Sequence, residues 1–199
     1  MKVSITKAFL LIYTALFIAS SLSAMVVWFK MRSGWSLPVM GDVPQFTFTE
    51  RRGTPFGLEQ LKGKVSVVDF IFTRCRDVCP AMGENMGELY RLYAKSPAVQ
   101  YVSISVDPEY DSLSVLRDYA DRMGVTDNRW KFLRGDVNDV VQLSERGFLL
   151  AADQLPAGHS SKFILVDDRA RIRGYYSGVD EKDVRQLERD IRRLLAAMK

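Results

Sequence analysis

The thiol and imidazole side chains of this chain are few, and their positions suggest shared chemistry. Both cysteines, Cys75 and Cys79, fall within the segment Cys-Arg-Asp-Val-Cys-Pro, and the single histidine is His159. Two thiols at this spacing can bind a metal or exchange with a disulfide. A purely stabilising disulfide is the alternative, but a bridge across so short a loop constrains the unfolded chain least. The pair therefore indicates redox or metal chemistry, with His159 able to complete such a site.

Three chemistries are open to these residues. Two thiolates and one imidazole suit copper, because thiolates select Cu(I) and imidazole also binds copper. Zinc fits less well, since structural zinc takes four ligands and the chain has no other cysteine or histidine. The second chemistry is that of a thioredoxin-type redox dithiol, although such motifs usually have two residues between the cysteines rather than three. The third is peroxide reduction by one cysteine, which leaves the other cysteine and His159 without roles.

The cysteines follow a segment with the composition of a central strand. Residues 65–72 are almost continuously apolar, as in a strand covered on both faces. Residues 80–94 have a helical pattern, with Pro80 in the first turn. The pair thus lies between the carboxyl end of a strand and the start of a helix, where backbone N–H groups favour negative charge. We expect this position to lower the pKa of the thiols and to supply thiolates.

Strand and helix patterns alternate along the rest of the chain and predict its fold class. Further strands are expected at 99–106, 130–133, 163–166 and 171–176, a hairpin near 43–55, and helices at 58–64, 112–123, 137–146 and 180–198. This order predicts an α/β, thioredoxin-like fold with a mixed central sheet flanked by helices. In such a fold the loop at 155–161, which carries His159, packs beside the cysteine-bearing helix.

The N-terminal segment predicts a membrane anchor. Residues 8–29 are uncharged, largely apolar and long enough for a membrane-spanning helix. A signal peptide cleaved near 21–24 is the alternative, but the apolar stretch exceeds the usual length of a signal sequence. We expect a cytoplasmic N-terminus at 1–7, a single transmembrane helix at 8–29, a linker at 30–41 and a thioredoxin-like domain at 42–199. The domain would then face the periplasm from the inner (cytoplasmic) membrane, in a compartment where disulfides persist.

The distribution of charge argues against a nucleic-acid partner. The formal net charge is +4, yet four of the 28 basic residues, Lys2, Lys7, Lys30 and Arg32, precede the first acid, Asp42. The remaining 24 basic residues balance 24 acidic ones over residues 42–199. Nucleic-acid binding needs a clustered basic face, and the arginines of 180–198 are instead interleaved with acids. We therefore expect no nucleic acid among the partners.

Several segments resemble the Sco/SenC family of copper chaperones. The resemblance covers residues 41–195 and is carried, in order, by 41–46, 61–64, 72–80, 105–111, 130–135 and 158–161. It implies a membrane-anchored, thioredoxin-like protein that binds Cu(I) or Cu(II) through Cys75, Cys79 and His159. The turn after the histidine departs from the family pattern, because Lys162, Asp168 and Ala170 replace a commoner Asp-Pro-Asp-Gly turn. This departure leaves the three ligands unchanged.

The resemblance also implies partners. The protein would receive copper from a donor chaperone. It would deliver copper to, or reduce the cysteines of, the binuclear copper site on cytochrome c oxidase subunit II, or serve another copper-accepting protein. Some relatives act mainly as thiol reductases or in redox signalling. A thiol-disulfide oxidoreductase with no metal role is therefore the alternative, and a copper-sensing regulator is a third possibility.

Four neighbouring residues are weaker candidates. Met82 and Met86 follow Cys79 on its helical face, and thioethers bind Cu(I), but packing in the core is the expected role. Asp107 ends a strand on the side of the cysteines and could offer an oxygen to Cu(II), yet an Asp before Pro ordinarily forms a turn. Asp77 is expected to cap the helix.

Overall fold

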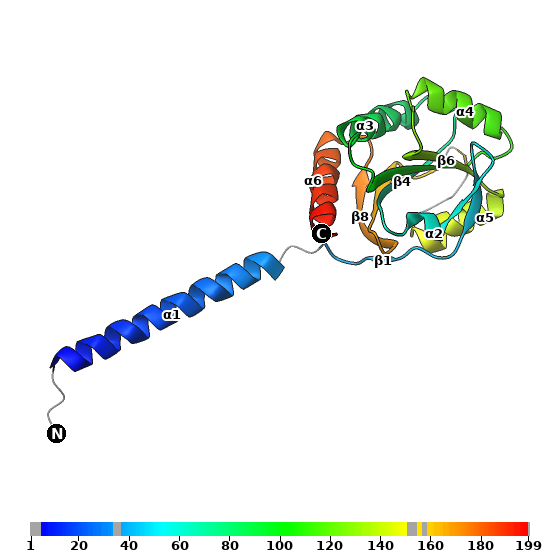
Figure 1. Ribbon diagram of the computed structural model, residues 1–199. Helices are drawn as coiled ribbons and strands as arrows, with labels where there is room; N and C mark the ends of the chain where they lie inside the picture. Colours follow the sequence, from blue (N-terminus) through cyan, green and yellow to red (C-terminus); the bar gives the residue numbers. More distant parts are fainter. Residues whose placement is uncertain (1–4, 34–36, 151–154, 157–158, 199) are drawn as a thin grey trace. The chain divides into compact units, whose positions relative to one another are not determined.

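The computed structural model describes residues 5–33, 37–150, 155–156 and 159–198, and the chain divides into two compact units, Met1–Ser36 and Leu37–Lys199. The first unit holds helix α1 (Ile5–Ser33; Figure 1). Large apolar side chains along α1 are exposed, among them Phe9, Phe17 and Trp28. Within the described residues, no helix has both the length and the apolar character needed to cross a membrane. The predicted helix is present, and its role as a transmembrane anchor stays a prediction.

The second unit is built on one mixed sheet, which has eight strands in the described part of the chain. In sheet order these are β1 (Gly41–Asp42), β8 (Arg171–Ser177), β7 (Lys162–Val166), β4 (Val65–Ile71), β5 (Val99–Ser105), β6 (Trp130–Arg134), β2 (Thr47–Glu50) and β3 (Pro55–Gly57). Strands β4, β5 and β6 are parallel, and every other pairing is antiparallel. The predicted mixed α/β sheet is confirmed.

Helices cover both faces of this sheet (Figure 1). One face carries α3 (Val78–Leu92), α4 (Leu113–Arg122) and α6 (Glu181–Ala197), and the other carries α2 (Leu58–Leu61), α5 (Val137–Gln142) and the π-helical turn η1 (Leu143–Gly147). Side chains of β4 alternate between the two faces: Val67 packs with α3 and α6, and Val68 packs with α2 and α5. Double coverage explains why this strand is almost entirely apolar.

The elements differ from the sequence-based expectations mainly at their ends. Helix α3 begins at Val78, two residues before Pro80, so Cys79 lies inside its first turn. The helix predicted at 137–146 changes to π-helical geometry at Leu143. The predicted hairpin is formed by β2 and β3. Strand β1, at the sheet edge beside β8, was not predicted, because a strand of two residues has no periodicity to recognise.

The antiparallel register of β4 and β7 brings the segment before β7 to the cysteines. Val68 pairs with Ile164. In an antiparallel pair, residue numbers rise along one strand as they fall along the other. Continuing this register by four residues therefore places Ser160 opposite Phe72. His159 therefore reaches the carboxyl end of β4, where the cysteine-bearing turn begins.

Candidate metal centre

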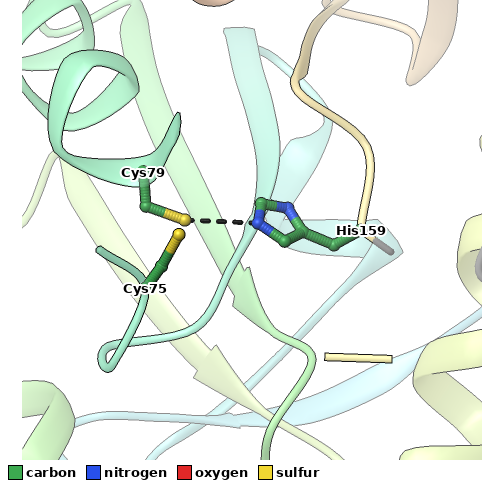
Figure 2. Close-up of side chains that lie close together, drawn as sticks. All are labelled: Cys75, Cys79 and His159. Atoms are coloured by element: carbon green, nitrogen blue, oxygen red, sulfur yellow. Dashed lines mark hydrogen bonds between the residues drawn. The ribbon is translucent and has the colours of Figure 1, made fainter. Parts of the chain in front are cut away.

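Cys75, Cys79 and His159 converge on one point (Figure 2). Their potential ligand atoms all lie within 4.8 Å of one another, and Nε2 of His159 is 3.3 Å from Sγ of Cys79. Figure 2 shows the two sulfur atoms side by side, with the imidazole facing Cys79. Among the described residues, no other three His, Cys, Asp or Glu side chains are close enough together to hold a metal ion.

The two thiols are held differently. Cys79 belongs to the first turn of α3 and is 3 % exposed, whereas Cys75 lies in the turn between β4 and α3 and is partly exposed. The Cys75 N–H donates a hydrogen bond to the Phe72 carbonyl at 3.1 Å, which closes this turn. The structure therefore presents one buried sulfur and one accessible sulfur.

Burial raises the pKa of the Cys79 thiol, with a further contribution from its hydrogen bond with Cys75. The prediction that the helix N-terminus would lower the pKa of this thiol is wrong. Desolvation penalises the thiolate more than a backbone hydrogen bond at Phe72 favours it. The Cys79 thiol therefore stays protonated at pH 7 in the metal-free chain, and binding of a soft cation would displace this proton.

His159 is poised as a neutral ligand. Burial lowers its pKa, so the imidazole is uncharged at pH 7. Its Nδ1 lies 3.2 Å from the Ser160 carbonyl oxygen. Because a carbonyl only accepts, this contact assigns the ring proton to Nδ1 and leaves the Nε2 lone pair facing Cys79. The Phe72 ring packs edge-on against the imidazole, with centroids 5.3 Å apart, and helps to orient it.

An open hollow of about 470 Å³ lies over the site. Cys75 and His159 line it, together with residues 72, 74 and 76–78, whereas Cys79 does not. A molecule that enters the hollow therefore meets Cys75 and His159 first, with Cys79 behind them.

The weaker candidates have other roles. Met82 and Met86 are fully buried in the core, as expected. The Asp107 carboxylate pairs with Arg74 at 2.6 Å instead of joining the cysteines. Asp77 occupies the N-cap position of α3, but its side chain makes no capping hydrogen bond, so that expectation is wrong. Of the motif at 158–161, residue 158 lies outside the described residues.

Asp111 was not identified from the sequence. This carboxylate is fully buried and accepts hydrogen bonds from Thr73, two residues before Cys75. Its position in the sequence could have indicated this role. Asp111 ends the segment Asp-Pro-Glu-Tyr-Asp, which follows β5 at the same sheet edge as the cysteines.

A family model described as SCO1/SenC matches residues 41–196 of the chain. This match spans more than half of the sequence and includes both cysteines and the histidine. The chain belongs to the SCO1/SenC family. The predicted resemblance is confirmed.

Solved structures of SCO1/SenC relatives share the fold. A SCO1/SenC family lipoprotein from Bacillus anthracis str. Ames is 34 % identical, with a TM-score of 0.72, over 78 % of this chain and 95 % of that chain. BsSco, described as a member of the Sco family of cytochrome c oxidase assembly proteins with a disulfide switch, is 30 % identical, with a TM-score of 0.71, over 80 % and 96 %. Bradyrhizobium japonicum ScoI, solved with copper bound, is 24 % identical, with a TM-score of 0.65, over 77 % and 99 %. These likenesses support the thioredoxin-like arrangement of the SCO1/SenC domain described here.

Proposed function

We propose that this chain is a copper-binding protein of cytochrome c oxidase assembly that holds the metal through Cys75, Cys79 and His159. The convergence of two sulfurs and one imidazole nitrogen within 4.8 Å carries the proposal. Soft sulfur donors with an imidazole match the preferences of copper, and the sequence has no further Cys or His for structural zinc. The copper-bound ScoI structure and the description of BsSco support the same function.

The hollow over the site is the route by which copper would be exchanged with another protein. Cys75 and His159 line the hollow, so an incoming protein would contact them before Cys79. We propose that a donor chaperone loads copper through this opening. Subunit II of cytochrome c oxidase, or another copper-accepting protein, would receive the metal by the same route.

Anaerobic titration of the reduced full-length chain with Cu(I), against a chromophoric chelator, tests this function. We expect one copper per chain and a loss of affinity of about tenfold or more in His159→Ala, since a ligand is removed. The control Met82→Leu should keep wild-type affinity, because Met82 packs in the core. Undiminished binding by His159→Ala would contradict the three-ligand site.

A thiol-disulfide oxidoreductase without a metal role is the second candidate. The hydrogen-bonded thiols of Cys75 and Cys79 favour it, because paired thiols can close to a disulfide. The deciding measurements are the reduction potential of the pair and its exchange rate with an oxidised fragment of oxidase subunit II. Fast exchange by a chain that binds no copper would favour this candidate over the first.

We further propose that α1 tethers the domain to the cytoplasmic membrane in a single pass, with residues 42–199 in the periplasm. The uncharged stretch 8–29 and the exposed apolar side chains of α1 support this, and the B. anthracis relative is described as a lipoprotein. Alkaline carbonate should leave the full-length chain in the membrane pellet and release a variant that lacks residues 1–29. Release of the full-length chain would argue against a spanning helix. In a separate experiment on sealed membranes, added protease should cut the domain from the periplasmic side only.

A further inference from the structure

The three ligands of the candidate centre are not equally secured by the fold. Cys79 is part of a helix, and His159 is held by its Nδ1 contact with Ser160 and by the Phe72 ring. Cys75 lies in an irregular turn, where its backbone donates a single hydrogen bond, to Phe72. A ligand in such a turn needs support from outside the turn, because metal affinity depends on ligands held in place before the metal arrives.

Asp111 supplies that support from the segment after β5, the strand that lies next to β4 in the sheet. It follows β5 and is 0 % exposed. Its Oδ1 accepts a hydrogen bond from the Thr73 hydroxyl at 2.5 Å, and its Oδ2 accepts one from the Thr73 N–H at 3.2 Å. Ser105, the last residue of β5, donates its hydroxyl to Oδ2 at 2.6 Å. The carboxylate thus joins the turn that carries Cys75 to the end of a central strand.

This buried carboxylate has no ion-pair partner in the part of the chain that the structure describes. Within the described residues, its carboxylate accepts hydrogen bonds from Thr73 and Ser105. Asp111 uses both carboxyl oxygens as acceptors, and an asparagine would replace one of them with an amide NH₂ donor. Because hydrogen bonds are stronger away from water, this loss should loosen Thr73 more than loss of an ordinary surface contact would.

A second contact joins the turn before Cys75 to the segment after β5, and it serves as a comparison for the contact between Asp111 and Thr73. Arg74 pairs with Asp107 at 2.6 Å, and its guanidinium stacks over Tyr110 at 4.2 Å from the ring centre. The Arg74 side chain is 53 % exposed, so solvent screens this pair. Asp107 and Asp111 thus hold neighbouring residues of one turn, the first through a partner that is 53 % exposed and the second in the interior.

We propose that Asp111 is a positioning residue for the metal centre: through Thr73 it fixes the turn that presents Cys75 to Cys79 and His159. This inference rests on the proposed copper function for its metal-binding test. Its effect on the Cys75 thiol stands without copper, because the contacts are those of the metal-free chain.

The metal test compares full-length variants that share the same turn. Asp111→Asn and Thr73→Val should each weaken Cu(I) affinity about 10- to 100-fold, and should alter the visible sulfur-to-Cu(II) absorption. Thr73→Ser keeps the hydroxyl and should restore both properties. Asp107→Asn should change affinity by no more than about twofold, because its partner Arg74 is largely exposed and solvent screens the pair. Wild-type affinity and absorption in a folded Asp111→Asn variant would overturn the proposal, and so would an equal loss in Asp107→Asn.

A second measurement keeps the proposal separate from the copper function. In a Cys79→Ser background, without metal, Asp111→Asn should speed alkylation of Cys75 by iodoacetamide, and Asp107→Asn should not. If the wild-type chain binds no copper, the copper function fails, and this rate alone decides the role of Asp111. If Asp111→Asn does not fold, as judged by circular dichroism, the contrast between Thr73→Val and Thr73→Ser decides. Equal rates in that pair would then overturn the proposal.

Discussion

His159 Nε2 lies 3.3 Å from Cys79 Sγ, although 80 positions separate the two residues in sequence. The imidazole covers the buried sulfur, while Cys75 remains partly exposed beside it. The two cysteines of one short motif therefore differ in accessibility, and Cys79 also differs from a free thiol in its raised pKa.

This difference predicts unequal alkylation of the reduced, metal-free chain. The Cys79→Ser variant, which retains Cys75, should react with iodoacetamide faster than Cys75→Ser, by about tenfold or more, because burial and a raised pKa both reduce thiolate attack. Intact-mass spectrometry over time gives both rates. In urea the two variants should react alike. Equal rates under native conditions would show that Cys79 is not shielded.

Asp69 predicts a pH dependence of stability. It lies on β4, is 2 % exposed, and its Oδ1 has no hydrogen-bond partner. Burial raises its pKa to about 7, although a hydrogen bond with Ser103 acts in the opposite direction. Between about pH 4 and pH 7 the folded chain holds a proton that the unfolded chain has released, so the stability of the fold declines as pH rises through this window.

Asp69→Asn should remove that decline. Relative to wild type, the variant should gain stability at pH 8, by up to about 4 kcal/mol for a shift of roughly three pKa units, and should gain little near pH 4. Urea unfolding of the metal-free chain at the two pH values measures both differences. An equal difference at both pH values would mean that the Asp69 carboxyl does not titrate in this window.

Gly178 links the cysteine-bearing helix to the histidine-bearing segment. Its carbonyl accepts a hydrogen bond from the Asn85 side chain of α3 at 2.8 Å, and its N–H donates to the Ser161 carbonyl at 2.8 Å. Because Ser161 is only two residues from His159, close approach at Gly178 helps to set how near the two halves of the centre lie.

Gly178→Ala should destabilise the fold by about 1–3 kcal/mol, because overpacking forces neighbours to move. The added Cβ would lie 3.0 Å from Met82 and 3.1 Å from Phe163, both fully buried. Gly41→Ala is the control: its nearest neighbour, Ile172, would be 4.0 Å away, an ordinary contact, so its loss should stay within about 0.5 kcal/mol. Urea unfolding compares them, and similar losses would refute the packing argument.

Arg173 secures the start of the second unit. It is 7 % exposed, pairs with the buried Asp167 at 2.7 Å, and donates to the carbonyls of Leu37 and Pro38. Arg173→Ala should cost about 3 kcal/mol, because it leaves two carbonyls without this donor and leaves Arg171 as the remaining ion-pair partner of the buried Asp167.

The matched control is Arg185→Ala, which removes an exposed pair with Glu181 and should cost about 0.5 kcal/mol or less. Thermal unfolding of the two variants gives the comparison. If Arg185→Ala were as damaging as Arg173→Ala, burial of the Arg173 pair would not explain its contribution.

Elements with a continuous signal of their own were predictable from sequence. The apolar run of β4 and the amphipathic pattern of α6 predict both their type and most of their length. The position of His159 depended on the fold class, since only the sheet order brings β7 next to β4. Once the thioredoxin-like strand order was expected, the cysteines and the histidine could be placed together at the carboxyl end of β4.

Burial of individual polar groups could not be predicted in the same way. Asp69 interrupts an apolar run, and Asp111 ends a turn-like segment, so neither residue differs locally from a solvated carboxylate. Their desolvation depends on layers contributed by distant segments. The pKa of Cys79 was predicted in the wrong direction for the same reason. The helix terminus can be recognised from the local sequence, whereas the burial of the sulfur depends on distant segments.

The insertion of β7 beside β4 also governs the order in which the centre is assembled. The ribosome releases the cysteines long before His159, and the loop between them must close before the antiparallel pair can form. Closing a long loop carries an entropic cost, so such pairing belongs to the late stages of folding. A chain in which β7 has not yet paired with β4 therefore carries the two thiols without the imidazole beside them. Completion of the sheet thus brings the three side chains together, and the candidate centre exists only in the finished fold.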